Sequence, residues 1–340
     1  ISIAIILFAF LSFYKNETIV GSLESSLQSV GIIEKESVGI LSFGDVMFDR
    51  GVRNIIENKK RDPFEYIKKD RDLIKDFDVT IVNLEGPIVE MDREKCQTKA
   101  YNFQFASNTP ERLKSIGVTM VTIANNHAFD CYRVGFESTK KYLTEAQIDF
   151  MGDRSLLKSY IIKTINNKKV AFIGIDETTA PIPVYNFYPL IKKLSTENDY
   201  VVVHIHWGTE YALTETPAQE RIAHALIDNG ADVIFGHHPH VIEPVRIYKG
   251  KAIFYSLGNF VFDQSAPHTT DGLGAGVRFY ADKAVFTLFP YKLNLFAPQF
   301  LKDLERDAFC NKFLRDLEHT ECSFESVSYT HLTLPTNREV

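Results

Sequence analysis

Five apolar segments of this 340-residue chain end in side chains that bind metal ions or carry protons. Asp45 ends the first segment, Glu85 follows the second and Asn126 the third, at nearly equal separations along the chain. His206 ends the fourth, and a cluster of histidines over residues 237–240 follows the fifth. Carboxylate, amide and imidazole ligands together suit Mn²⁺, Fe²⁺ or Zn²⁺. These residue types therefore predict a site for one or two divalent ions.

Two ions would make hydrolysis possible at such a site. Ions about 3.5–4 Å apart lower the pKa of a bridging water and hold the oxygens of a displacement at phosphorus. We expect His127, beside Asn126, to face the same site and to donate a proton to the leaving oxygen. Each residue also has a structural alternative: an Asp can cap a turn, an Asn can form one, and a lone His can bond within a core. The coincidence of five segments favours the metal site.

The segments that must position these residues alternate between strands and helices. Apolar runs predict buried strands at 38–46, 78–84, 118–124, 199–206 and 231–235. Helical spacing predicts helices at 63–77, 107–116, 135–147 and 216–228, and hairpins are expected within 160–175, 241–256 and 276–289. Ligands of open α/β sheets bind at the carboxyl ends of the strands. We therefore expect an α/β fold in one domain over residues 37–300.

The composition is that of an ordinary globular chain. Hydrophobic residues make up 45% and charged residues 24%, which excludes a wholly disordered chain, a collagen-like fibre and a polytopic membrane protein. The formal net charge is −6, so we expect no nucleic acid as a partner. The four cysteines include no Cys-x-x-Cys pair, which disfavours a thiolate zinc site.

Both ends of the chain suggest a fragment. Residues 1–14 are apolar and uncharged, and a polar segment follows over 15–36. This run is shorter than the ~20 residues that span a bilayer, but the chain opens on Ile, so we expect its true start to be missing. Residues 1–14 are then expected to belong to a signal segment or a single N-terminal membrane anchor, with 15–36 as a linker and the catalytic domain extracytoplasmic. A buried helix or strand is the alternative. Residues 301–340 are expected to form a tail, of which 326–340 look non-native.

Six short motifs around the site residues resemble, in order, those of the CapA family of capsule or poly-γ-glutamate synthesis proteins. The motifs are Gly44-Asp45-Val46-Met47, Asn83-Leu84-Glu85, Ala124-Asn125-Asn126-His127, His206-Trp207-Gly208-Thr209-Glu210-Tyr211, Gly236-His237-His238-Pro239-His240 and Tyr255-Ser256-Leu257-Gly258-Asn259-Phe260. The fold of that family is similar to calcineurin-like metallophosphoesterases. The resemblance, over residues 38–290, implies a layered α/β sandwich of mixed central sheets flanked by helices.

The resemblance also implies a role for each residue. His127 would be the catalytic neighbour of the ions, and two of the three histidines at 237, 238 and 240 would be ligands, with the His-x-His spacing favouring the last two. The implied metal ligands are Asp45, Glu85, Asn126, His206, His238 and His240. The residues expected to contact substrate or to form the rim of the site are His237, Glu210, Tyr211 and Asn259. His204 is expected to face away from the site.

One position departs from the superfamily pattern. The first motif of metallophosphoesterases is Asp-x-His, whereas Met47 occupies the His position here. A thioether is a poor ligand for a hard divalent ion. One of the two ion sites is therefore expected to be weak or empty.

Two functions follow from the resemblance. The first is a membrane-anchored hydrolase of capsule or poly-γ-glutamate synthesis or export, which would direct a metal-bound hydroxide at a phosphoester or an amide bond of a cell-surface polymer. The second, favoured by Met47, is a non-catalytic accessory subunit working with other capsule-synthesis membrane proteins.

The four cysteines could form two disulfides if the domain is extracytoplasmic. Cys96 could then pair with Cys131 and Cys310 with Cys322. Free buried thiols are the alternative.

Overall fold

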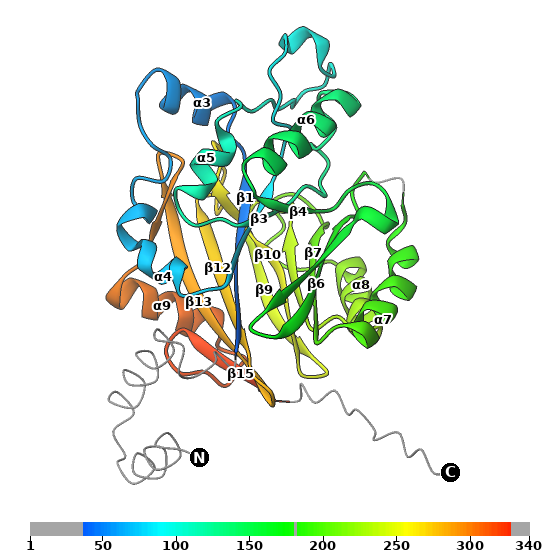
Figure 1. Cartoon of the computed structure of the whole chain (residues 1–340). Helices are drawn as coiled ribbons and strands as arrows, with labels where there is room; N and C mark the ends of the chain where they lie inside the picture. The colour runs from blue at the N-terminus through cyan, green and yellow to red at the C-terminus, as the bar shows by residue number, and fades with distance from the viewer. Residues whose placement is uncertain (1–36, 180–181, 328–340) are drawn as a thin grey trace, which may run out of the picture. The chain divides into compact units, whose positions relative to one another are not determined.

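The computed structural model describes residues 37–179 and 182–327 (Figure 1). The chain divides into two units, Ile1–Ser37 and Val38–Val340, and the second is the folded domain described here. In it two β-sheets pack face to face, and helices cover the outer face of each sheet (Figure 1). The predicted α/β class and the layered sandwich are confirmed.

The first sheet has nine strands and carries three of the five predicted strand ends. Its order is β14-β13-β12-β1-β2-β3-β4, with β11 paired to β1 and β15 to β13. The strands from β1 to β4 run parallel. The bounds are β1 Val38–Val46, β2 Val79–Leu84, β3 Met120–Thr122, β4 Asp149–Met151, β11 Asn259–Val261, β12 Asp271–Phe279, β13 Lys283–Asn294, β14 Ala297–Phe300 and β15 Ser323–Val327.

The second sheet has six strands in the order β5-β6-β7-β8-β10-β9. Its centre, from β6 to β10, is parallel, and β5 and β9 are antiparallel edge strands that form two of the three expected hairpins. The bounds are β5 Tyr160–Ile165, β6 Lys168–Asp176, β7 Tyr200–His206, β8 Val233–His237, β9 Ile242–Tyr248 and β10 Lys251–Leu257.

Most helices lie on the two outer faces because their apolar sides complete two outer cores, whereas the last helix adds Cys310 to the core between the sheets. Their bounds are α3 Arg50–Glu57, α4 Arg71–Lys75, α5 Thr109–Lys114, α6 Tyr132–Glu145, α7 Tyr188–Glu197, α8 Pro217–Asp228 and α9 Asp303–Phe313, with short 3-10 turns η1 Ile67–Asp70, η2 Arg93–Lys95, η3 Leu156–Lys158 and η4 Val184–Phe187. Helices α3, α5 and α6 pack on the first sheet, and α7 and α8 on the second. A capping box formed by Thr216 and Gln219 starts α8.

Strand alternation distributes the core among three layers. In β7, Val202 faces the core between the sheets, whereas Val201 and Val203 face the helices. In β1, Ile40 faces the inner core and Leu41 the helices. Both faces of each central strand are therefore buried, which explains their uninterrupted apolar sequence.

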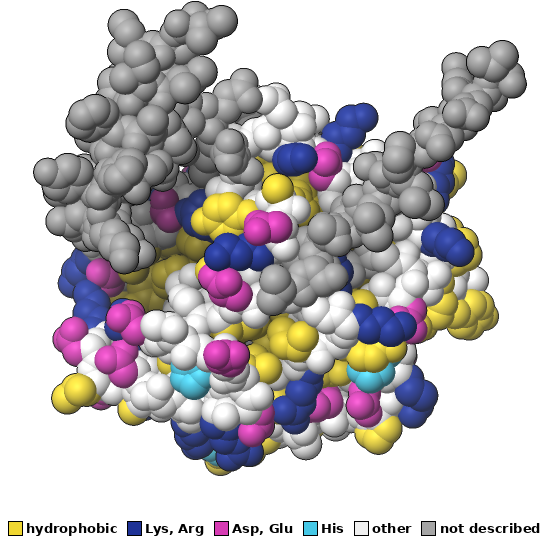
Figure 2. Space-filling view, turned by 90° about the horizontal axis from the view of Figure 1, so that it is seen from below, with side chains coloured by type: hydrophobic (Ala, Val, Ile, Leu, Met, Phe, Trp, Pro, Cys, Tyr) yellow, Lys and Arg dark blue, Asp and Glu magenta, His cyan; other side chains and the backbone are white. Residues whose placement is uncertain are grey.

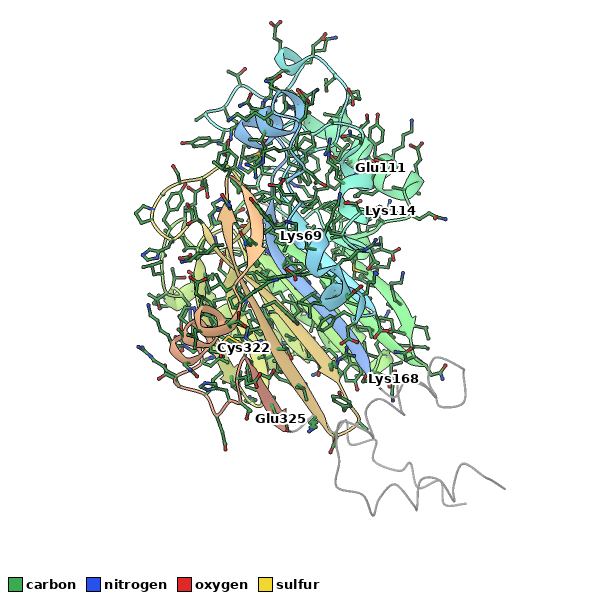
Figure 3. All side chains as sticks on the ribbon, turned by 90° about the vertical axis from the view of Figure 1, so that its left-hand side faces the viewer. Lys69, Glu111, Lys114, Lys168, Cys322 and Glu325 are labelled. Carbon is green, nitrogen blue, oxygen red and sulfur yellow. A yellow bond between two sulfur atoms is a disulfide. The ribbon has the colours of Figure 1, made fainter. Side chains whose placement is uncertain are left out.

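The structure adds helices α3 and α7, which were not expected, and differs from the expectation in two further segments. The helix predicted over 63–77 is instead η1 followed by α4, because Asp70 leaves the helical path with φ −107° and ψ 22°. The folded domain also extends beyond residue 300: α9 packs against β13, and β15 pairs with it through Val327. Figure 3 shows Cys322 and Glu325 at this edge.

Several expectations concern residues outside those described. The anchor at 1–14, the linker at 15–36 and most of the segment 326–340 fall there. Across the described ranges, every helix is too short or too polar to cross a membrane.

Candidate metal centre

The carboxyl ends of β1, β2, β3, β7 and β8 meet at one edge of the sandwich. This happens because β1, β2 and β3 are parallel in one sheet, β7 and β8 are parallel in the other, and the two sheets face each other. All the ligands predicted from the sequence lie at these ends or in the loops that follow them. We call the following residues the ligand cluster: Asp45, Glu85, Asn126, His206, Glu210, His238 and His240.

Two glycines allow the strands to come close enough to form the cluster. Gly44 precedes Asp45, and a Cβ atom at Gly44 would lie 1.8 Å from the carbonyl oxygen of Gly258. Gly236 precedes His237, and a Cβ atom there would lie 1.9 Å from the carbonyl oxygen of Tyr255. Any side chain at either position would push the backbones apart.

Asp45 is fully buried and is held from several sides. Asn83 Nδ2 donates to its Oδ1 at 2.8 Å, and the backbone N–H of His238 faces its Oδ2 at 3.3 Å. His237 Nδ1 and His240 Nδ1 each lie 3.3 Å from one of its oxygens. Burial opposes ionisation, but the two histidines outweigh it and lower the pKa of Asp45 well below its usual value. Asp45 is therefore a carboxylate, able to serve as a ligand.

Glu85 is the member of the cluster whose charge is not satisfied. Both carboxylate oxygens are buried without a hydrogen-bond partner. His240 Nε2 lies 3.7 Å from Oε1, and His127 Nε2 lies 4.0 Å from it. Burial raises the pKa of Glu85 well above its usual value, and the charges of Asp45 and Glu210 add to this effect. A buried carboxylate without partners is costly unless a cation is bound, so this position fits a metal ligand.

The ligand atoms form two groups. Oxygen and nitrogen atoms of Asp45, Glu85 and His206 lie within 4.8 Å of one another. Those of Glu210, His238 and His240 form a second group at the same limit. Asn126 Oδ1 lies 2.9 Å from His206 Nε2 and adds an oxygen beside the first group. This mixture of carboxylate, amide and imidazole suits one or two transition-metal ions.

Met47 does not contribute to either group. Its side chain is buried in the core below the helices, where its sulfur accepts a hydrogen bond from the backbone N–H of Asp49 at 3.0 Å. Glu210, predicted only as a rim residue, offers a carboxylate to the second group instead. Because Met47 stands in place of the His of the Asp-x-His pattern and is not a donor here, the second group consists of three donor side chains, those of Glu210, His238 and His240.

His127 faces the cluster with a defined tautomer. Its Nδ1 lies 2.7 Å from Asp130 Oδ2, and since a carboxylate only accepts, Nδ1 carries the hydrogen. Phe103 stacks on its ring at 4.1 Å, and Lys99 lies 2.5 Å from the other oxygen of Asp130. Burial lowers the pKa of His127, although Asp130 opposes the shift. At neutral pH the Nε2 lone pair is free to accept a proton.

Three residues in the loops around the cluster have positive φ values, which residues other than glycine rarely adopt. His238, His240 and Tyr211 have φ values of 99°, 59° and 66°. The backbone N–H of Tyr211 donates to the carbonyl of Pro239 at 2.8 Å, which joins the two loops. Such strain concentrates at functional sites.

Three predicted placements differ from the structure. His237, expected at the rim, is 1% exposed and lies below the cluster between Asp45 and His204. Asn259 is fully buried and its Oδ1 lies 3.0 Å from His240 Nδ1, so it orients the ring of His240. His204, expected to face away, shares the inner face with His206, because strand residues two apart point to the same side.

Several polar residues of the site had no predicted role. Asn83 and Asn125 form a buried bridge, with Asn125 Nδ2 donating to Asn83 Oδ1 at 3.0 Å. Asp130 follows His127 by three residues, so a turn of the chain brings the two side chains together, and this spacing is the signal that could have identified it. Lys99 left no comparable signal, because its partner is set by loop geometry.

A disulfide joins Cys96 to Cys131 and fixes part of the rim, and a second joins Cys310 to Cys322, so both expected pairings are confirmed. Cys131 directly follows Asp130, and the N–H of Gln97 donates to the Asp130 carbonyl at 2.7 Å. The segment 96–105, which carries Lys99 and Phe103, is thereby attached to the turn that holds His127.

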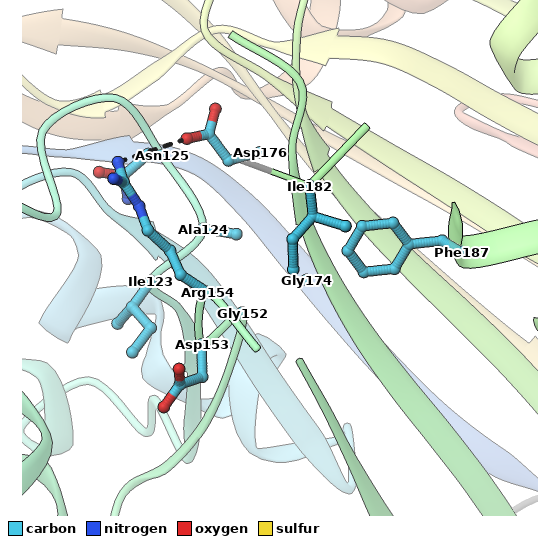
Figure 4. Close-up of a pocket in the computed structure, with 10 residues that line it drawn as sticks. All are labelled: Ile123, Ala124, Asn125, Gly152, Asp153, Arg154, Gly174, Asp176, Ile182 and Phe187. Atoms are coloured by element: carbon cyan, nitrogen blue, oxygen red, sulfur yellow. Dashed lines mark ion pairs between the residues drawn. The ribbon is translucent and has the colours of Figure 1, made fainter. Parts of the chain in front are cut away.

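A small pocket lies beside the cluster, between the ends of β3 and β6 (Figure 4). Arg154 and Asp176 face each other in it with their nearest charged atoms 4.0 Å apart. Arg154 also lies over the ring of Phe129 at 4.0 Å. The pocket is narrow, and Asp176 already accepts hydrogen bonds from Thr178 and Thr179.

Comparisons with known proteins agree on one family. The family described as "Bacterial capsule synthesis protein PGA_cap" matches residues 39–264. The "PGA biosynthesis protein CapA" of Bacillus subtilis (strain 168) is 32% identical over 71% of this chain, and the "Capsule biosynthesis protein CapA" of Bacillus anthracis is 32% identical over 70%. The aligned residues span 67% and 63% of these relatives, about two thirds of their length.

Solved structures give weaker likenesses. A hypothetical protein from Thermus thermophilus is 16% identical with a TM-score of 0.48, covering 76% of this chain and 100% of that one. Vacuolar Protein Sorting 29 from Cryptosporidium parvum is 14% identical with a TM-score of 0.36, covering 78% and 97%. Likeness at this level carries no argument about activity. The sequence matches, in contrast, place this chain in the bacterial capsule synthesis protein family PGA_cap.

Proposed function

We propose that this protein is a metal-dependent hydrolase of capsule or poly-γ-glutamate synthesis, acting on a phosphoester or an amide bond of a cell-surface polymer. The observation that carries the proposal is Glu85, a fully buried carboxylate whose two oxygens have no hydrogen-bond partner. It faces Asp45, His206 and His240, so three further ligands surround the position where a cation would neutralise it.

The residues of the cluster would divide between holding ions and moving protons. Asp45, Glu85, Asn126 and His206 would hold one ion, and Glu210, His238 and His240 a second. Bound ions would supply Lewis acidity to a water and to the scissile bond. His127, with Nδ1 fixed by Asp130, presents Nε2 to the same space. Neutral His127 can take a proton from water, and once protonated can give it to a leaving oxygen or nitrogen.

We further propose an extracytoplasmic location with a single N-terminal anchor. The two disulfides support it, because such bonds persist in oxidising compartments outside the cytoplasm. The capsule proteins named CapA, to which this chain is similar, support the assignment to polymer synthesis. Other membrane proteins of capsule synthesis are the expected partners.

Elemental analysis of the purified protein tests the metal centre directly. We expect one or two equivalents of Mn, Fe or Zn per chain, and loss of at least half of that metal in Asp45→Ala and His240→Ala. His224→Ala is the matched control, because His224 stacks on Tyr248 of β9, away from the cluster. Hydrolysis of p-nitrophenyl phosphoesters and of γ-glutamyl peptides, measured on the same samples, should follow the metal content.

A non-catalytic accessory role is the second candidate. It is favoured by Met47, which leaves the Asp-x-His position without a nitrogen ligand. One relative carries the name "Probable polyglutamine synthesis accessory protein" (Mycobacterium tuberculosis, strain H37Rv; 25% identity over 60% of this chain). Protein that binds no metal and hydrolyses neither substrate class would favour this function over the first.

A further inference from the structure

Arg50 is a cation beside the ligand cluster that the proposed chemistry does not use. It begins α3, four residues after β1 ends, and has a positive φ of 48°. Its guanidinium lies 5.0 Å from the ring centroid of Phe103 and 5.7 Å from that of Phe262. Phe103 stacks on His127 at 4.1 Å, and Phe262 lies 4.8 Å from the ring of His240. One aromatic ring therefore separates Arg50 from His127, and another separates it from His240 of the ligand cluster.

The guanidinium of Arg50 is fixed in place, yet some of its donors are unused. Its Nη2 pairs with Asp263 Oδ1, while Asp263 Oδ2 accepts the N–H of Gly51 at 2.8 Å. This double contact orients the side chain. Arg50 Nε is buried without a partner, and the side chain as a whole is 32% exposed. A guanidinium has five N–H donors, so an incoming anion could be bound without breaking the Asp263 pair.

Exposed aromatic residues surround this cation on the solvent side. Tyr101, 62% exposed, lies with its ring centroid 5.6 Å from the guanidinium. Tyr211, 46% exposed, lies 6.3 Å from His240, and its hydroxyl accepts from Gln264 Nε2 at 3.1 Å. Burial, Glu210 and Tyr101 raise the pKa of Tyr211, and Arg50 opposes the shift.

The net charge of the protein makes a local cation necessary for an acidic ligand. The chain carries −6 overall, and a polyanion would be repelled by it at long range. A guanidinium held by aromatic faces in a partly water-excluded position binds carboxylates more strongly than an exposed lysine does, because its planar fork can bind both oxygens. Flat aromatic side chains add contact for the carbon chain between acidic groups.

We propose that Arg50, supported by Tyr101, is a specificity-determining residue that binds a carboxylate of an anionic polymer beside the metal centre. The inference rests on the proposed function, since it names the substrate class of the same site. A γ-linked glutamate polymer carries one free α-carboxylate per residue. Arg50 would hold one of these groups while a neighbouring bond of the chain reaches the ligand cluster.

The test is a binding measurement on the full protein with two matched probes. One is a fluorescently labelled γ-linked glutamate decamer, and the other is the same decamer with its α-carboxylates converted to amides. We expect wild-type protein to bind the acidic decamer at least about 10-fold more tightly than the amidated one. Arg50→Gln should remove this preference, and Tyr101→Ala, an exposed position that should not affect folding, should reduce it severalfold.

Arg278→Gln is the matched control. Arg278 also pairs with an aspartate, Asp76, and also lies over an aromatic ring, that of Phe77 at 5.1 Å. It lies beside Gly39, at the opposite end of β1 from Asp45. Figure 2 views that end, where basic and acidic side chains are interspersed on the visible described surface. This variant changes the net charge as Arg50→Gln does and should keep the wild-type preference.

The outcomes separate this inference from the proposed function. Wild-type protein that holds metal but binds both decamers equally overturns the role of Arg50 and leaves the metal centre intact. An Arg50-dependent preference in protein without metal supports the inference and contradicts the proposed hydrolase. Inorganic polyphosphate of equal charge that binds as tightly, and with the same dependence on Arg50, would show a general anion site and overturn the assignment to carboxylates.

Discussion

His240 Nε2 lies 3.7 Å from Oε1 of Glu85, so this imidazole approaches a buried carboxylate that has no hydrogen-bond partner. Its other nitrogen lies 3.3 Å from Asp45. Burial lowers the pKa of His240, but the two carboxylates outweigh it and raise that pKa to about 9. A protonated His240 thus supplies part of the positive charge that a metal ion would bring. The proton and the ion compete for one position.

This competition predicts a pH-dependent metal affinity. Because His240 must lose its proton to bind an ion, affinity should rise with pH and level off near its pKa of about 9. Between pH 6 and 8 we expect about a tenfold gain in affinity for Zn²⁺ per pH unit. Competition titration against a chromophoric chelator measures it, after correction for the chelator's own protonation. His224→Ala should keep the slope, whereas His240→Ala should flatten it; a wild-type affinity that does not change with pH contradicts the assignment.

We expect the contact between His127 and Asp130 to matter for turnover but not for metal binding. Asp130→Asn replaces the acceptor of the His127 Nδ1–H with a group that can also donate, so the tautomer and ring orientation are no longer fixed. We expect hydrolysis to fall by about 10²-fold, the lower range for a general acid or base. Metal content should remain as in wild type, because Asp130 lies outside the ligand cluster.

Asp72→Asn, at an exposed position on α4, is the control for this variant and should hydrolyse substrate at the wild-type rate. Loss of metal together with activity in Asp130→Asn would assign Asp130 to the structure of the metal centre instead.

The ends of the central strands could be predicted from the sequence because burial dictates them. The segment 38–46 reads as a buried strand and is β1 with those bounds, and the parallel arrangement then brings Asp45 and Glu85 to the same edge. Loop residues could not be predicted in the same way. Glu210 joins His238 and His240 from loops in which Tyr211 and both histidines adopt positive φ values, and the sequence does not indicate these conformations.

Contacts between residues distant in the sequence could not be predicted from it either. Arg50 lies among Tyr101, Phe103 and Phe262, three residues from two loops, and no spacing in the sequence indicates that they meet. His204 shows the opposite case: period-two alternation already places it on the face of His206, so the sequence was sufficient and the expectation that it faces away was wrong.

We expect removal of the two disulfides to have different consequences for stability and activity. They close loops with sequence separations of 35 and 12 residues, so they should contribute about 4 and about 3 kcal/mol, respectively, to the free energy of unfolding. Cys96→Ser with Cys131→Ser should also lower hydrolysis, because it frees the segment that carries Lys99 and Phe103. Cys310→Ser with Cys322→Ser should lower stability alone. Urea unfolding and activity assays on both double variants measure this; equal effects on activity would contradict a link between the first disulfide and the site.

The environment of Glu243 on β9 leads us to expect that the free energy of unfolding depends on pH, independently of bound metal. Its Oε2 accepts from Gln219 Nε2 at 2.7 Å, but its buried Oε1 has no hydrogen-bond partner. Burial raises the pKa of Glu243 to about 7, and the bond from Gln219 only partly opposes this. Because the folded state holds the proton more tightly than the unfolded chain, the stabilisation is fully present below pH ~4.5 and is lost as the pH rises through about 7.

Glu243→Gln should therefore become more stable relative to wild type as the pH increases. The difference in free energy of unfolding should shift in favour of the variant by up to about 3 kcal/mol between pH 4.5 and 8, the equivalent of the raised pKa. Urea unfolding at both pH values, in a chelating buffer, measures the shift. Glu111→Gln, on the exposed side of α5 (Figure 3), should follow wild type at both pH values. A constant difference between Glu243→Gln and wild type would mean that Glu243 is already ionised in the folded protein at pH 4.5, with a water or a moved side chain as partner for Oε1.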